Sequence, residues 1–207
     1  MADIVSRRSI ILAAPALFVA RHAVAALAPT PGAADGPFYP VEIPPDDDND
    51  LVLAEPALRE AEGDILHFSG TVLGVSGDAV PAARVEIWQC DARGIYHHPG
   101  YKRFASRDAG FQGFDHSTTD GHGRFMFRTI VPVPYPGRTP HIHLKVILGD
   151  EARLTTQYYR AGFEQNAGDF LFRRLSPEER ERASMDVKPR VSGTRQEFEA
   201  DIAIVLR

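Results

Sequence analysis

Apolar and polar residues alternate along much of the chain after residue 64. In residues 83–90, ARVEIWQC, Val85 and Ile87 fall on one side of an extended strand, and Glu86 and Trp88 fall on the other. Further runs of similar length are rich in β-branched or aromatic residues and are bounded by turn residues; they are residues 65–75, 123–130, 141–148, 153–160 and 197–206. The pattern predicts an all-β fold, a β-sandwich of two packed sheets.

Two stretches depart from the strand pattern. A short helix is predicted within residues 176–185, SPEERERASM, in the C-terminal half, with Ser176 as the N-cap and Pro177 at the first helical position. Residues 26–62 are rich in Pro, Asp and Ala, and predict an irregular arm that wraps the sandwich. We therefore expect the β-sandwich domain to occupy residues 63–207.

Residues 1–25 have the pattern of a targeting segment. Arg7 and Arg8, in SRRSIIL, precede the apolar run 10–20, and a small-x-small motif ends at Ala25. The apolar run is shorter than the roughly 20 residues that span a bilayer. We predict a twin-arginine-type signal peptide, export to the bacterial periplasm or the extracellular space, and no stable membrane insertion after cleavage. A buried N-terminal helix and an uncleaved signal anchor are the alternatives.

Composition narrows the class of protein. The 207 residues suit one domain with a sizeable core, and 43% hydrophobic and 25% charged residues are typical of a globular protein. The net charge of −5 and the lack of a basic cluster argue against nucleic acid as a partner. The single cysteine, Cys90, excludes an internal disulfide.

The acidic run 46–50, DDDND, lacks the ligand spacing of an EF-hand, so we interpret it as a solvated loop. Assembly into a homo-oligomer is left open.

Candidate chemistry is concentrated in RTPHIHL, residues 138–144. His141 and His143 project from the same face of a strand, so both can reach one metal, although such pairs also occur as ordinary strand residues. Tyr135 precedes the pair in a short loop, and Tyr96 follows a strand end. Two phenolates and two imidazoles suit ferric iron better than zinc or copper(I).

Several motifs together resemble, in order, those of the intradiol ring-cleavage dioxygenases, the family of protocatechuate 3,4-dioxygenase. They are GPFYP (36–40), EIWQCDARGIYHH (86–98), TDGHGRFMFRTIVP (119–132), YPGRTPHIHLKV (135–146) and TTQYY (155–159). The resemblance covers essentially the whole chain after the targeting segment. Gly137 stands where the protocatechuate enzymes have a longer loop with a tryptophan, and the helical N-terminal dimerisation segment of the catechol and hydroxyquinol enzymes has no counterpart. A small exported, single-chain branch of the family fits best.

The resemblance implies a ligand set and a reaction. The residues that match the family's non-haem Fe(III) ligands are Tyr96, Tyr135, His141 and His143. Arg138 and Gln157 match residues that border the substrate and bias its charge, and Tyr135 matches a tyrosine that helps to deprotonate it. The implied protein is an oxidoreductase of aromatic compound catabolism. It cleaves a catechol-type ring between the two hydroxyl-bearing carbons with O2, and gives a muconate-type diacid; which catechol is cleaved stays open.

Other classes account for part of the pattern. Residues 67–88, HFSGTVLGVSGDAVPAARVEIW, also resemble the prealbumin-like modules of surface and carbohydrate-binding proteins. A non-enzymatic binding module of that kind explains the strands and export, but has no need for two tyrosines and two histidines together. A zinc hydrolase needs a carboxylate near the paired histidines as its base, and the motif contains none.

Overall fold

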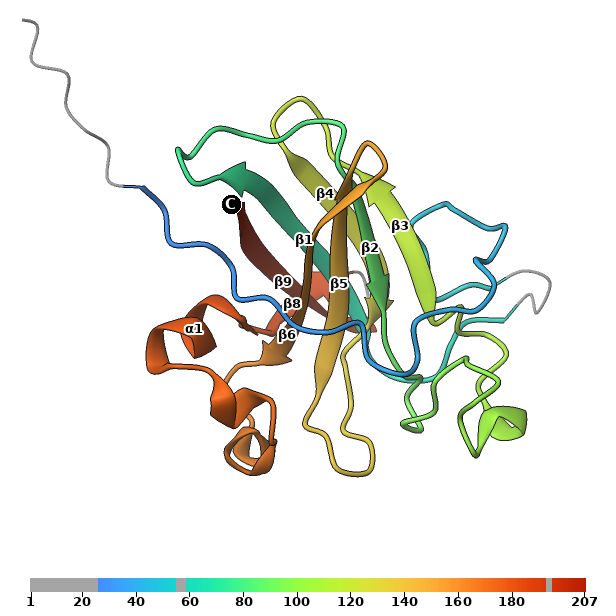
Figure 1. Cartoon of the computed structure of the whole chain (residues 1–207). Coiled ribbons are helices and arrows are strands. Elements are labelled where there is room, and N and C mark those ends of the chain that lie inside the picture. Colours follow the sequence, from blue (N-terminus) through green and yellow to red (C-terminus); the bar gives the residue numbers. More distant parts are fainter. Residues whose placement is uncertain (1–25, 55–58, 193–194) are drawn as a thin grey trace, which may run out of the picture.

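The computed structural model describes residues 26–54, 59–192 and 195–207. Two β-sheets pack face to face around an apolar core (Figure 1). One sheet has the strand order β4-β1-β9-β8, and the other has the order β3-β2-β5-β6-β7. The strands are β1 (Ile65–Gly74), β2 (Arg84–Trp88), β3 (Phe114–Thr118), β4 (Arg124–Ile130), β5 (His141–Leu148), β6 (Glu151–Arg160), β7 (Ser184–Met185), β8 (Lys188–Ser192) and β9 (Arg195–Leu206). The predicted β-sandwich is confirmed.

Helical structure is confined to short elements. They are η1 (Phe104–Ser106), η2 (Glu164–Gly168), η3 (Phe172–Arg174) and α1 (Pro177–Arg182). The predicted helix is confirmed as α1, and its N-terminus is a reciprocal capping box: the Glu179 backbone N–H donates to the Ser176 hydroxyl, and the Ser176 backbone N–H donates to the Glu179 carboxylate. Across the described ranges, none of the helices has the length and apolar content needed to cross a membrane.

Three strands lie outside the runs that the sequence pattern predicts. β3, FDHST, pairs with β2 at one edge of its sheet, although it is short and mostly polar. β7 has two residues, too few to show a period, and β8 contains a proline and pairs with β9 at the edge of the other sheet. An edge strand needs only one apolar face and pairs with one neighbouring strand, so its hydrophobic pattern is a weak predictor of strand structure.

The core lies between the two sheets and explains the alternating pattern. Phe68 on β1 and Ile87 on β2 are fully buried in the same apolar cluster. Gly70 lets β1 lie close to the side chains of Ile202 and Phe125 on its two neighbouring strands, because a Cβ atom at position 70 would lie 2.7 Å from both residues. A larger residue at position 70 would push β1 away from its neighbours.

The central strand β5 is buried on both faces. Ile142 and Leu144 enter the core between the sheets, while His141, His143 and Lys145 point the other way and are still buried. The N-terminal arm contributes this outer cover: it crosses the face of the second sheet as the blue segment in Figure 1. This double cover explains why polar side chains on β5 are removed from solvent.

Backbone hydrogen bonds hold the arm against both sheets. The Thr30 backbone N–H donates to the Val205 carbonyl at 3.0 Å, and the Ala33 N–H donates to the Thr155 carbonyl at 2.7 Å. An irregular arm is therefore present, and the boundary at residue 63 stays a prediction. The predicted signal peptide, residues 1–25, lies outside the described residues.

Candidate metal centre

The paired histidines of β5 converge on one point. The Nε2 atoms of His141 and His143 are 3.3 Å apart, and both side chains are buried. The alternation of a strand puts these two residues on the same face, as the sequence predicts. Two ring nitrogens this close can share one metal ion as ligands.

The surroundings of each ring fix its orientation. The His141 Nδ1 lies 2.7 Å from the Thr139 carbonyl oxygen, which can only accept, so Nδ1 carries the proton and Nε2 keeps its lone pair. Burial lowers the pKa of His141 to about 3, which keeps the ring neutral. The His143 ring stacks on Trp88 with centroids 4.8 Å apart, and burial lowers its pKa as well. Both histidines are therefore neutral, the form that binds metals.

Tyr96 comes from the loop that follows β2. The buried Asp91 carboxylate accepts hydrogen bonds from the backbone N–H groups of Arg93 and Ile95, at 2.9 and 3.0 Å, and so shapes the turn before Tyr96. Gly94 has a φ of 71°, and a Cβ there would lie 3.0 Å from the Pro134 carbonyl oxygen. A glycine is thus required where this loop meets the loop of Tyr135.

The Tyr96 hydroxyl is a buried polar group with no hydrogen-bond partner among the described residues. Burial is the main reason why the pKa of Tyr96 lies well above its usual value. An unpaired buried hydroxyl costs free energy, so this atom is a candidate for binding something other than protein.

Tyr135 completes the group from the loop between β4 and β5. Its ring is perpendicular to that of Tyr96, with centroids 5.2 Å apart, and its centroid lies 5.6 Å from that of His141. Its hydroxyl accepts a hydrogen bond of 3.4 Å from an Arg138 guanidinium nitrogen. Burial raises the pKa of Tyr135, and the Arg138 charge opposes that shift.

The four predicted ligands are thus brought together, and their chemistry fits ferric iron. Two imidazole nitrogens and two phenolic oxygens form a mixed set in which the phenolates are hard anionic donors. Within the described part of the chain, no group of three or more His, Cys, Asp or Glu side chains could hold a metal ion. At this place Tyr96 and Tyr135 offer phenolic oxygens as further donors beside the two histidines.

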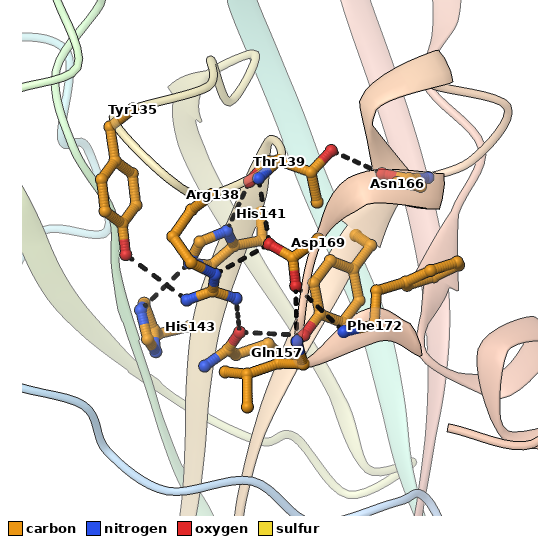
Figure 2. A network of polar contacts seen from close by, with 11 residues as sticks. Tyr135, Arg138, Thr139, His141, His143, Gln157, Asn166, Asp169 and Phe172 are labelled. Atoms are coloured by element: carbon orange, nitrogen blue, oxygen red, sulfur yellow. Dashed lines mark hydrogen bonds and ion pairs between the residues drawn. The ribbon is translucent and has the colours of Figure 1, made fainter. Parts of the chain in front are cut away.

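Arg138 and Gln157, the other predicted site residues, lie beside this group (Figure 2). An Arg138 guanidinium nitrogen donates to the Gln157 side-chain oxygen at 2.6 Å. The Arg138 Nε donates to the Asp169 carboxylate at 2.8 Å. Asp169 was not predicted: it is a lone acidic residue between two short helical turns, and only its place before the apolar residues 170–172 hints at a capping role.

A cleft of about 450 Å³ opens beside Tyr135, the one candidate ligand that lines it. Its lining includes Tyr135, Gly137, Arg138, Gln165 and Asp169. A Cβ atom at Gly137 would meet nothing within 4 Å, so this wall of the cleft is open. The cleft gives a small molecule a place next to Tyr135 and Arg138.

The arm covers the opposite side of the group. The Phe38 ring stacks on Tyr96, with centroids 4.8 Å apart and an interplanar angle of 28°. The Tyr39 hydroxyl donates to the Glu86 carboxylate at 2.8 Å, and the Lys145 ammonium lies 3.9 Å from the Tyr39 ring centroid. Tyr39 therefore anchors the arm, while Phe38 contacts a candidate ligand.

Comparison with known proteins agrees with this fold. A family model described as "Dioxygenase" matches residues 34–201, most of the chain. The chain belongs to the intradiol ring-cleavage dioxygenase family.

Curated relatives include enzymes named for several catechols. The chain is 30% identical over 156 residues to hydroxyquinol 1,2-dioxygenase of Rhodococcus opacus. The matched region makes up 66% of this chain and 48% of that protein. It is 36% identical over 134 residues to the protocatechuate 3,4-dioxygenase beta chain of Burkholderia cepacia, covering 60% of this chain and 57% of that one. The chain thus spans about half the length of the curated relatives that it matches.

Solved structures show the same fold. The dioxygenase domain of a dioxygenase carbohydrate-binding protein fusion from Streptomyces sp. SirexAA-E is 32% identical, with a TM-score of 0.62, covering 87% of this chain and 100% of that one. Catechol 1,2-dioxygenase from Acinetobacter sp. ADP1 is 22% identical, with a TM-score of 0.67, covering 86% of this chain and 62% of that one. At that identity the second comparison bears on the fold alone.

Proposed function

We propose that this protein is an Fe(III)-dependent intradiol dioxygenase that cleaves a catechol-type ring between its two hydroxyl-bearing carbons. The observation that carries the proposal is the convergence of two neutral histidines with two buried tyrosines. The residues that would hold the iron are Tyr96, Tyr135, His141 and His143. When bound, ferric iron supplies Lewis acidity that draws electron density from a coordinated catechol and opens the ring to attack by O2.

Tyr135 has the position of a proton acceptor. It is only half-buried and borders the cleft, whereas Tyr96 is enclosed. If the metal held Tyr135 as a phenolate, against the raised pKa of the free side chain, its oxygen beside the Arg138 guanidinium could take the proton of a catechol hydroxyl that enters from the cleft. The enclosed Tyr96 is suited to remain a ligand throughout.

Arg138 supplies fixed positive charge at the border of the cleft. Its side chain is 9% exposed, so its charge acts in a medium of low polarity. Negative charge that develops on the ring during the reaction is stabilised by such a preorganised guanidinium. Gln157 accepts from one guanidinium nitrogen and so limits the directions in which the remaining N–H groups point.

The substrate class is a small catechol, and both atoms of O2 enter the muconate-type product. The relatives are named for hydroxyquinol, protocatechuate and catechol, which share the vicinal diol. The open wall at Gly137 leaves room for a ring substituent. Which ring substituent of the catechol this protein prefers must therefore be measured.

The test is oxygen uptake by iron-loaded protein with catechol, protocatechuate and hydroxyquinol in turn. We expect one molecule of O2 consumed per molecule of one or more substrates, with a muconate-type absorption in the product. Tyr96→Phe is the matched control, because it removes one ligand oxygen and keeps the packing ring. Uptake with none of the three, by a protein shown to hold iron, would reject the proposal.

Export is a separate part of the proposal and rests on residues 1–25. The paired arginines Arg7 and Arg8, the short apolar run and the small-x-small motif support a twin-arginine signal peptide. N-terminal sequencing of protein recovered outside the cytoplasm tests it: a start at or near residue 26 is expected, and retention of the full chain in the cytoplasm would contradict it.

A further inference from the structure

A buried carboxylate stands directly behind the candidate site. Asp169 lies between the short helical turns η2 and η3, and its side chain is 0% exposed. It reaches the base of the loop that carries Arg138 (Figure 2). No motif of the sequence points to it.

The two oxygens of Asp169 have different partners. Oδ1 accepts from the backbone N–H groups of Leu171 and Phe172, both at 2.9 Å, which ties it to the start of η3. Oδ2 accepts from the Arg138 Nε at 2.8 Å and from the Thr139 backbone N–H at 3.1 Å. One side of the carboxylate is thus held rigidly, and the other side holds Arg138.

All three guanidinium nitrogens of Arg138 are engaged. Nε donates to Asp169, one terminal nitrogen donates to the Gln157 oxygen at 2.6 Å, and the other donates to the Tyr135 hydroxyl at 3.4 Å. The Gln157 oxygen is itself fixed, because it also accepts from the Tyr159 hydroxyl at 3.0 Å. Asp169 is the only carboxylate among these partners.

The same carboxylate connects to the histidine ligands. Thr139, whose N–H donates to Asp169, uses its carbonyl oxygen to fix His141 Nδ1 at 2.7 Å. The Thr139 hydroxyl donates to Asn166 of η2 at 2.6 Å. The segment of η2 and η3 therefore braces the loop on which Arg138 approaches the site.

We propose that Asp169 is a positioning residue that sets the orientation of Arg138 toward Tyr135 and the bound catechol. The catalytic part of this inference rests on the proposed function. Without the carboxylate, the long arginine side chain has several orientations of similar energy, and its charge is no longer directed at the reacting ring.

Asp169→Asn is the variant of choice because it preserves shape and removes the charge. The retained oxygen can accept from Leu171 and Phe172, but the new NH2 group then faces two donors, the Arg138 Nε and the Thr139 N–H. We expect kcat to fall about 10- to 100-fold, as for other supporting partners of metal sites, with the iron content unchanged. Asp186→Asn, at an exposed position, is the charge-matched control and should match the wild type.

A double-mutant cycle separates positioning from a general structural effect. If Asp169 acts through Arg138, the double variant with Arg138→Ala and Asp169→Asn is no slower than Arg138→Ala alone. If the two losses multiply, Asp169 does not act through Arg138, and the inference is overturned. Arg138→Lys is a second variant for the case that Arg138→Ala does not fold, because lysine leaves Asp169 a cationic partner. Combining Asp169→Asn with Arg138→Lys should then lower kcat little further.

A second readout needs no turnover. In NMR spectra of the full chain without iron, the Arg138 Nε–H should give a resolved, slowly exchanging signal in the wild type and in Asp186→Asn, and should lose it in Asp169→Asn. Persistence of the signal in Asp169→Asn would overturn the positioning role. A wild type that shows the signal but turns over no catechol would instead overturn the proposed function, so the two failures are distinguishable.

Discussion

The carboxyl group of Asp115 should make the stability of this protein fall as the pH rises from about 4 to about 7. Asp115 lies on the edge strand β3 with a fully buried side chain. Its Oδ1 accepts from the His116 backbone N–H at 2.6 Å, and its Oδ2 has no hydrogen-bond partner within the described ranges. Burial raises the pKa of Asp115 from 3.8 to about 7; the His116 bond opposes this, and the carboxylates of Asp48 and Asp46 add to it.

The sign and size follow from proton linkage. Below pH 3.8 the carboxyl is protonated in both states; between 3.8 and about 7 the unfolded chain ionises while the folded chain retains the proton. Stability is therefore lost across this window and levels off above it. At about 1.36 kcal/mol per pH unit the upper bound over the whole window is roughly 4 kcal/mol, of which about 3 kcal/mol falls above about pH 4.5.

Asp115→Asn removes the titrating group and keeps an oxygen for the His116 N–H. We expect urea unfolding to show the variant gaining about 2–3 kcal/mol on the wild type between pH 4.5 and pH 8, whatever constant offset the new amide introduces. Asp201→Asn, at an exposed position, controls for the change in net charge. A difference between variant and wild type that is the same at both pH values would refute the reasoning.

Three further substitutions test the site and its cover. Tyr39→Phe removes the hydrogen bond to Glu86, which is 3% exposed, and should cost about 1–3 kcal/mol in urea unfolding; unchanged stability would show that this bond does not anchor the arm. Gly36→Ala should cost about 1–2 kcal/mol and weaken iron binding, because φ is 76° and the new Cβ would lie 3.4 Å from His143; equal iron affinity by competition with a chelator would contradict this. Arg138→Ala should keep its iron but turn over catechol about 100-fold more slowly; an unaltered rate in stopped-flow assays would refute its role.

The features that depend on local sequence patterns were predicted well. Alternation placed the long strands, and the same period put His141 and His143 on one face. The capping pattern at Ser176 placed α1, because a helix start is a local feature. The short edge strands β3, β7 and β8 were missed because pairing, and not their own composition, holds them in the sheets.

The assembly of the candidate site depended on more than periodicity. Tyr96 and Tyr135 come from separate loops; ligand chemistry suggested the pair and the resemblance to a family strengthened it, but the distance of 5.2 Å between their ring centroids comes from the structure. Asp169 escaped prediction because a single loop aspartate has no spacing to mark it, and its role arises from a chain reversal that brings it behind Arg138. Likewise, the stacking of Phe38 on Tyr96 depends on the path of an arm without regular structure.

The measurement that tests the central claim most directly is the metal content and visible spectrum of the chain after loading with Fe(III). Four ligands around one point predict about one ferric ion per chain and a red-brown colour from tyrosinate-to-iron charge transfer. Tyr96→Phe and Tyr135→Phe should each weaken or shift that absorption, while Asp186→Asn leaves it as in the wild type. A colourless wild-type protein with no iron by elemental analysis would contradict the claim and favour a binding module without enzyme activity.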